Sequence, residues 1–128
     1  MRYLSLDVGT RRTGIAYLDD AVGIPLPLDT LHHESLEQLT KSVLEIVRTR
    51  GVGTVIIGLP KLPSGDEGSQ ASISREVGTL LQKSIDVRYV DERYTTPKTR
   101  NHKNVLSAAE YDGDAAAACA LLSGKIDY

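Results

Sequence analysis

Acidic side chains stand at the points of this sequence where a strand is expected to end or a helix to begin. Asp7 closes a short apolar segment, Glu92 closes another, and Asp112 and Asp114 precede an alanine-rich run. Burying a carboxylate is costly unless a partner compensates its charge. Asp7 needs such a partner most, because the segment before it is otherwise apolar, and a metal ion or a phosphate-handling site is the usual reason to keep an acid there.

Three converging carboxylates favour Mg²⁺ or Mn²⁺, which prefer oxygen ligands. Two such ions about 4 Å apart activate a water molecule and stabilise the leaving oxygen in phosphodiester cleavage. Without metal, the acids would repel one another and raise one another's pKa. The pattern therefore predicts a metal site for phosphoryl chemistry, with Asp7, Glu92 and either Asp112 or Asp114 as ligands.

Some of these acids also have a purely structural interpretation. Asp112 or Asp114 can cap the last helix, where Asp is favoured and the helix dipole stabilises its charge. Asp91 and Glu92 are neighbours on a strand and point to opposite faces, so only one of them can enter a given site.

Hydrophobic patterning predicts the elements that must position the acids. Residues 2–8 and 13–18 are expected to form a hairpin, and residues 24–31 an edge strand, because Pro25 and Pro27 cannot donate to a ladder. The further expected elements are a helix from Ser35 that Gly51 stops, a strand over 52–58, a loop over 59–68, a helix over 69–83, a strand over 87–90, a short helix started by Pro97, and a last helix from Asp112 or Asp114 to Leu122.

A hairpin followed by alternating strands and helices predicts an α/β fold with a mixed sheet and helices on both faces. Ligands bind to such open sheets at the carboxyl ends of the strands. Asp7 and Glu92 would meet there if the first and last strands lie near each other. The length of 128 residues fits one domain that spans residues 1–128.

The composition excludes several classes of protein. The formal net charge is −2, so the chain is not a globally basic nucleic-acid binder. A single cysteine, Cys119, excludes an intramolecular disulfide and a Cys-based zinc site, and it is expected to be a small buried hydrophobe. The sequence shows neither a signal-peptide core nor a membrane-spanning run, so we expect a cytoplasmic protein without a membrane partner.

Basic side chains follow the acids and form a predicted collar for phosphates. Arg11 and Arg12 stand in the turn after Asp7, and Lys61 stands in a glycine-rich loop. The remaining candidates for nucleic-acid contacts are Arg93, Thr95, Lys98, Arg100 and Lys103. Exposed Lys and Arg are also ordinary on any surface, and Thr95 can equally cap a helix. His32 and His33 are expected at the surface, Gly58 is expected to allow close approach of the backbone, and His102 is a weak candidate for proton transfer.

Four blocks of the chain, in order, resemble the YqgF/RuvX family of RNase H-like nucleases, which are also described as Holliday-junction-resolvase-like and as pre-16S rRNA nucleases. The blocks are Asp7–Ala16, Gly58–Ala71, Asp91–Thr96 and Asp114–Ala118. The resemblance implies an RNase H-like fold with a five-stranded mixed sheet whose second strand is antiparallel. It also implies that Asp7, Glu92 and Asp114 are metal-binding catalytic acids, with Asp112 as the alternate because the segment before Asp114 looks short for the family.

The expected function is therefore a Mg²⁺- or Mn²⁺-dependent nuclease that acts on pre-rRNA, at the 5′ end of pre-16S rRNA in ribosome biogenesis. One alternative is a resolvase of branched DNA, which would need a homodimer rather than a monomer. Another is a ribosome-assembly factor without catalysis. Asp7-Val8-Gly9-Thr10 also resembles the phosphate loop of actin-like and sugar-kinase ATPases, but those proteins enclose the nucleotide between two such domains.

Overall fold

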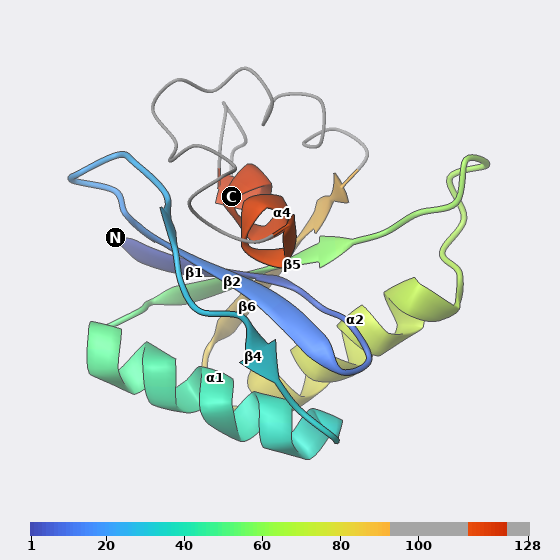
Figure 1. The fold of residues 1–128 in the computed structure, drawn as a ribbon, viewed down its shortest axis with the longest axis horizontal. Helices are drawn as coiled ribbons and strands as arrows, with labels where there is room; N and C mark the ends of the chain where they lie inside the picture. The colour runs from blue at the N-terminus through green and yellow to red at the C-terminus, as the bar shows by residue number, and fades with distance from the viewer. Residues whose placement is uncertain (93–112, 123–128) are drawn as a thin grey trace.

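A six-stranded mixed sheet forms the centre of the molecule, as a computed structural model of residues 1–92 and 113–122 shows (Figure 1). The strands are β1 (Arg2–Asp7), β2 (Arg12–Asp19), β3 (Leu26–Pro27), β4 (Leu31–His32), β5 (Thr54–Leu59) and β6 (Asp86–Asp91). Their order is β3-β2-β1-β5-β6, and β4 pairs with β2 off this path. β2 runs antiparallel to β1, whereas β5 is parallel to β1 and to β6, so the expected antiparallel second strand is confirmed.

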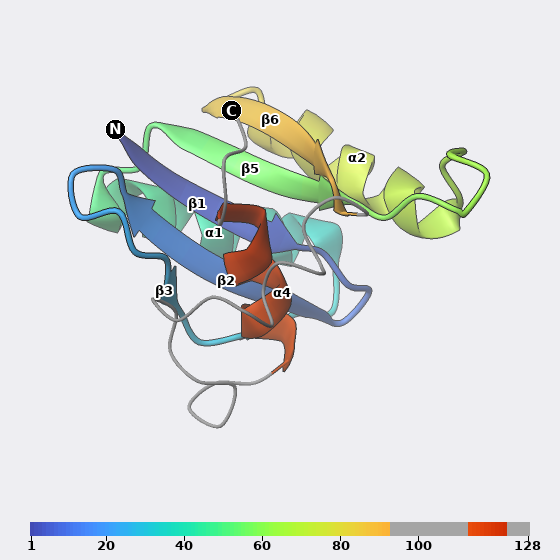
Figure 2. The ribbon, with the colours of Figure 1, turned by 90° about the horizontal axis from the view of Figure 1, so that it is seen from above.

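Helices cover both faces of the sheet, as the sequence predicts (Figures 1 and 2). α1 (Leu36–Arg50) and α2 (Ser69–Leu81) pack on one face, and α4 (Gly113–Leu122) packs on the other. The larger apolar cluster lies between the sheet and α1 and α2, and a smaller cluster lies under α4. We call the face of the sheet that α1 and α2 cover the two-helix face, and the face that α4 covers the α4 face. The fold is therefore a mixed α/β layer structure.

Side-chain alternation along β1 assigns its residues to these two faces. Leu4 and Leu6 are fully buried and belong to the cluster on the two-helix face. Successive side chains of a strand point to opposite faces, so Ser5 and Asp7 belong to the α4 face. Asp7, the last residue of β1, is thus placed at the carboxyl end of a central strand, under the layer that holds α4.

Local signals set the ends of α1. Ser35 has an extended backbone, and its side-chain oxygen accepts a hydrogen bond of 3.1 Å from the N–H of Gln38. Gly51 ends the helix with a φ of 65°, in the left-handed region that favours glycine. Both predicted ends are therefore confirmed.

The segment 24–31 is not one edge strand but contains two short strands. β3 lies at the edge of the sheet as predicted, and β4 pairs with the start of β2. Pro25 and Pro27 lack the N–H groups that a continuous ladder requires, so pairing stops after two residues and resumes nearer the hairpin turn.

A buried hydrogen bond ties α4 to the sheet. The Ser5 hydroxyl donates to the carbonyl oxygen of Ala118 over 2.7 Å. Beside it, Cys119 is fully buried, as predicted, and burial raises the pKa of its thiol to about 11. A reactive thiol needs the opposite shift, so Cys119 acts as a hydrophobe. Among the described helices, none combines the length and the apolar character that crossing a membrane requires.

Replacing Ser5 with Ala should loosen the attachment of α4. The variant loses one buried hydrogen bond, so the free energy of unfolding should fall by about 1 kcal/mol. Urea unfolding measures this change, with Ser72→Ala as the control because Ser72 is an exposed serine on α2. Equal stabilities of the two variants would contradict the tether.

Candidate active site

Asp7 and Glu92 meet at the carboxyl edge of the sheet although their strands are not neighbours. β5 separates β1 from β6, and two strand spacings amount to about 9.5 Å. The register pairs Leu6 with Ile57 and Leu59 with Asp91, so Gly58 lies between the carboxyl ends of β1 and β6. The residue between the acids is therefore one that has no side chain.

Glu92 lies across the gap that Gly58 leaves. A Cβ atom added at Gly58 would stand 2.9 Å from Glu92 Cγ and 3.0 Å from Glu92 Cδ, and it would overlap Glu92 Oε1 more closely still. Real Cβ atoms essentially never come so near to another heavy atom. The glycine therefore gives the Glu92 side chain its path over β5 toward Asp7, and the close approach expected at Gly58 is found.

The two carboxyl groups share a proton in the absence of metal. The pKa of Glu92 is raised from its ordinary 4.5 to about 8, first by burial, then by a side-chain hydrogen bond with Asp7 and by the charges of Asp7 and Asp91. Two carboxylates in one site cannot both ionise freely, so one retains its proton well above the usual range. The two carboxyl groups therefore form a site that attracts a cation.

The donor set fits a hard divalent cation. Asp7 and Glu92 supply carboxylate oxygens only, and such oxygens are the ligands of Mg²⁺ and Mn²⁺. The described part of the chain contains no group of three or more His, Cys, Asp or Glu that could hold a metal. Asp114 lies in the first turn of α4, but its side chain is not among the described atoms. Asp112 lies outside the described residues altogether. The described residues therefore bring together two of the predicted ligands.

The turn after Asp7 carries the two predicted arginines next to the acids. Arg11 and Arg12 are exposed, and together with Gly9, Thr10 and Gln70 they line a cavity of about 300 Å³. A Cβ atom at Gly9 would overlap the carbonyl oxygen of Arg12, so the turn can close this tightly only with glycine there. This places two guanidinium groups at the end of the sheet where Asp7 lies.

Lys61 lies on the long loop between β5 and α2, which extends from the body of the molecule (Figures 1 and 2). It forms an isolated antiparallel bridge with Glu67 near the base of this loop. Glu67 in turn binds Arg75 through two hydrogen bonds of 2.6 and 2.7 Å. Lys61 therefore follows β5, which contains Gly58, and the Glu67–Arg75 pair attaches its loop to α2.

Several predicted site residues lie outside the described part of the chain. They are Arg93, Thr95, Lys98, Arg100 and Lys103, together with His102 and the short helix expected at Pro97. Their roles stay predictions.

The sequence-based interpretation of His33 is wrong. His33 is only 4% exposed, whereas it is expected at the surface. The pairing of β4 with β2 turns its ring inward, where Nε2 lies 2.8 Å from Thr13 Oγ1 in a buried hydrogen bond. Burial, and then the neighbouring His32, lower the pKa of His33. Alternation with Leu31 was the signal that could have revealed the inward position.

Comparisons with known proteins found similar sequences that match nearly the whole chain. A family described as "RuvX: Holliday junction resolvase" matches residues 1–128. A protein of Anaeromyxobacter sp. (strain Fw109-5) named "Putative pre-16S rRNA nuclease" is 35% identical over 99% of this chain and 97% of its own length. A protein of the same name from Pelagibacter ubique (strain HTCC1062) is 28% identical over 100% of this chain and 89% of its own length.

Two solved structures share the fold at low sequence identity. The RuvC protein of T. thermophilus, in complex with a Holliday junction substrate, aligns with a TM-score of 0.67 and 11% identity over 95% of this chain and 90% of its own. The large terminase nuclease of the thermophilic phage G20c aligns with a TM-score of 0.60 and 11% identity over 95% of this chain and 80% of its own. The RNase H-like architecture expected from the sequence is thereby confirmed.

Replacing Gly58 with Ala should push Glu92 away from Asp7. The new methyl group would occupy the path of the Glu92 side chain, and such overpacking destabilises a protein by about 1–3 kcal/mol. Gly53→Ala is the matched control, since a Cβ atom there meets only the flexible side chain of Met1 at 3.1 Å and the Arg2 carbonyl oxygen at 3.9 Å. Thermal unfolding compares the two variants, and an undisturbed Gly58→Ala protein would argue against the crossing of Glu92 over β5.

The metal-free protein should lose stability as the pH rises from about 4.5 to about 8. Folded Glu92 holds its proton up to about pH 8, whereas in the unfolded chain it ionises near 4.5. The stabilisation is therefore complete below pH 4.5 and is lost as the pH rises through about 8. Unfolding in EDTA at several pH values should show a smaller decline in Glu92→Gln than in the wild type.

Glu45→Gln provides the control for that pH series. Glu45 is an exposed residue of α1, and its side chain lies 3.9 Å from Arg48. This variant should follow the wild-type pH profile. If Glu92→Gln also follows it, the acids do not share a proton.

Proposed function

The chain belongs to the family of RuvX Holliday junction resolvases, and on that premise we propose that it is a nuclease whose catalytic centre is the acid pair Asp7–Glu92. The resemblance to the YqgF/RuvX family that the sequence indicates is confirmed, and with it the class of nucleases. The observation that supports the assignment of the centre is the meeting of two carboxyl groups over Gly58 at the carboxyl edge of the sheet. Active sites of open α/β sheets form at this edge.

We propose that Asp7, Glu92 and Asp114 hold Mg²⁺ or Mn²⁺, with Asp112 as the alternate third ligand. When bound, two such ions would activate the attacking water and stabilise the leaving oxygen of a phosphodiester. Asp7 and Glu92 supply the negative charge that retains the ions, and Glu92 must give up the proton that it shares with Asp7 as an ion binds. Cleavage should therefore be favoured on the alkaline side of neutrality.

Other residues of the chain would orient the substrate. Arg12, in the turn after Asp7, can donate to a phosphate oxygen beside the cleaved bond, and Arg11 can contact the nucleic acid from the same turn. Lys61 can contact the backbone from the loop between β5 and α2. Arg93, Thr95, Lys98, Arg100 and Lys103 are the further proposed contacts. Gly58 would act as a positioning residue, since it gives Glu92 its path to Asp7.

The proposed substrate is pre-rRNA, at the 5′ end of pre-16S rRNA. Relatives that align over nearly their whole length carry the name of a nuclease of this RNA. With a net charge of −2, the chain has no excess of positive charge for binding nucleic acid non-specifically. Bound cations and the local arginines would therefore supply the attraction.

Branched DNA is the second candidate substrate. The family description names a Holliday junction resolvase, and the RuvC protein that shares this fold was solved on a Holliday junction. Symmetric cutting of a four-way junction needs two active sites and hence a dimer. Sedimentation at working concentrations, with cleavage mapping on a junction and on a pre-16S transcript, separates the two, because a monomer that cuts only the transcript excludes the resolvase.

Replacing Asp7 with Asn should abolish metal-dependent cleavage while the fold persists. The loss should exceed the roughly 100-fold that removal of a ligand's outer partner costs, because the ligand itself is changed. Cleavage of a labelled pre-16S 5′ fragment in Mn²⁺ measures activity, and circular dichroism measures folding. Calorimetric titration with Mn²⁺ should show weakened binding in the same variant.

Asp20→Asn is the matched control, since Asp20 is an exposed acid at the opposite end of β2. It should cleave as the wild type does. Full activity of a pure Asp7→Asn sample would overturn the proposed centre. Absence of Mn²⁺ binding and of cleavage in the wild type would instead favour an assembly factor without catalysis.

A further inference from the structure

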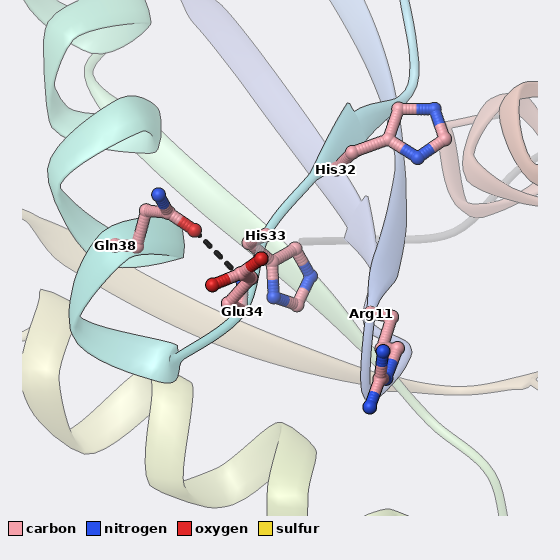
Figure 3. Close-up of a pocket in the computed structure, with 5 residues that line it drawn as sticks. All are labelled: Arg11, His32, His33, Glu34 and Gln38. Carbon is pink, nitrogen blue, oxygen red and sulfur yellow. Dashed lines mark hydrogen bonds between the residues drawn. The ribbon is translucent and has the colours of Figure 1, made fainter.

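A second cavity lies on the other side of the hairpin turn from the acid pair. Its volume is about 340 Å³, and its walls are Arg11, His32, His33, Glu34 and Gln38 (Figure 3). We call it the hairpin pocket. It is formed where the turn after β1 meets β4 and the start of α1, and its size falls at the lower end of the range for ligand pockets.

His33 gives this pocket a buried wall with an unused polar atom. Nε2 is occupied by Thr13 Oγ1 at 2.8 Å, but Nδ1 is buried and has no hydrogen-bond partner among the described residues. Buried polar atoms of native proteins nearly always have a partner, in the protein, in water or in a ligand. His33 therefore holds, behind the pocket wall, a buried polar atom that no described residue satisfies.

The charged groups of the pocket select what kind of ligand fits. Arg11 can only donate hydrogen bonds and the Glu34 carboxylate can only accept them. No hydrogen bond or ion pair links either side chain to another described residue, although the Glu34 backbone N–H donates to Gln38 Oε1 over 2.7 Å. Glu34 would repel a phosphate group, and Arg11 would repel a metal ion. A flat, rigid ligand that carries acceptors on one edge and donors on the adjacent edge satisfies both side chains.

We propose that the hairpin pocket binds one unpaired guanine base of the nucleic-acid substrate, an inference that rests on the proposed function for the identity of that substrate. Guanine offers the acceptors O6 and N7 to an arginine, and its N1–H and N2–H₂ groups can donate to a carboxylate. Exposed His32 supplies a flat ring on which an unstacked base can lie. Adenine lacks the O6 acceptor and the paired donors, so the pocket discriminates between the two purines.

The position of the pocket ties this base to the site of cleavage. Arg11 follows Asp7 by four residues, which span at most about 14 Å. Thr13 points to the two-helix face, with its hydroxyl on His33, whereas Asp7 points to the α4 face. A nucleic-acid strand that reaches both the hairpin pocket and the acid pair must pass around the turn between β1 and β2. The bound guanine would therefore fix which phosphodiester bond, a few nucleotides away, meets the acids.

Binding without cleavage tests the proposal on the full chain. Fluorescence anisotropy in EDTA compares a labelled uridine decamer that contains one central guanosine with a decamer that contains one central adenosine. The guanosine decamer should bind about tenfold more tightly, the discrimination typical of one bidentate contact. Glu34→Gln should remove this preference, because an amide no longer accepts both guanine donors.

Glu37→Gln is the matched control, since it makes the same change of charge in the first turn of α1 but does not line the pocket. It should retain the tenfold preference. The His33 imidazole ¹⁵N resonances should also shift on addition of the guanosine decamer. These resonances should stay in place with the adenosine decamer.

Equal affinities for the two decamers in the wild type would overturn the proposal, as would a preference that persists in Glu34→Gln. Competition by inorganic phosphate together with equal affinities would identify a phosphate subsite and would also overturn it. The proposed nuclease centre is tested separately by Asp7→Asn. A guanine preference with no cleavage refutes only the centre, and cleavage with no guanine preference refutes only the pocket.

Discussion

The absence of one side chain, at Gly58, is the constraint on which the proposed catalytic centre depends. The topology places Asp7 at the end of β1 and Glu92 directly after β6, and these two strands are two positions apart in the sheet. Any larger residue at position 58 would place its Cβ atom 2.9 Å from Glu92 Cγ and 3.0 Å from Glu92 Cδ. The acids meet because Gly58, which lies between the ends of β1 and β6, has no side chain and leaves that space to Glu92. The requirement for glycine there comes from the space beside the strand and not from a special backbone angle, since Gly58 has no positive φ.

Bringing two carboxyl groups together opposes folding, so the rest of the molecule must hold them in place. Fully buried Leu4 and Leu6 anchor β1 to the two-helix face, and Val55 and Ile57 do the same for β5. These apolar contacts compensate for the burial of a group whose pKa is raised to about 8. A bound cation would remove the repulsion between the two carboxylates. The same repulsion that destabilises the metal-free site would therefore favour the binding of a metal ion.

The sequence predicted the features that depend on local chemistry. Ser35 and Gly51 mark the ends of α1, and Asp7 ends its strand, because capping and hydrophobic alternation act within a few residues. The features that escaped prediction depend on pairing between distant segments. His33 is buried because β4 pairs with β2, and the 24–31 segment is divided because its prolines interrupt that pairing. The path of Glu92 over Gly58 likewise could not be predicted without knowing the order of the strands in the sheet.

The position of β6 has a consequence for how the site responds to thermal motion. Within the described part of the chain, β6 has a neighbouring strand on one side only, whereas β1 lies between β2 and β5. Edge elements open more readily than central ones, and such opening requires less free energy than global unfolding. Asp7 therefore ends a strand that is paired on both sides, whereas Glu92 follows a strand that is paired on one side. The proposed catalytic centre would therefore be lost when β6 detaches locally, at temperatures where the layers on both faces of the sheet are still packed.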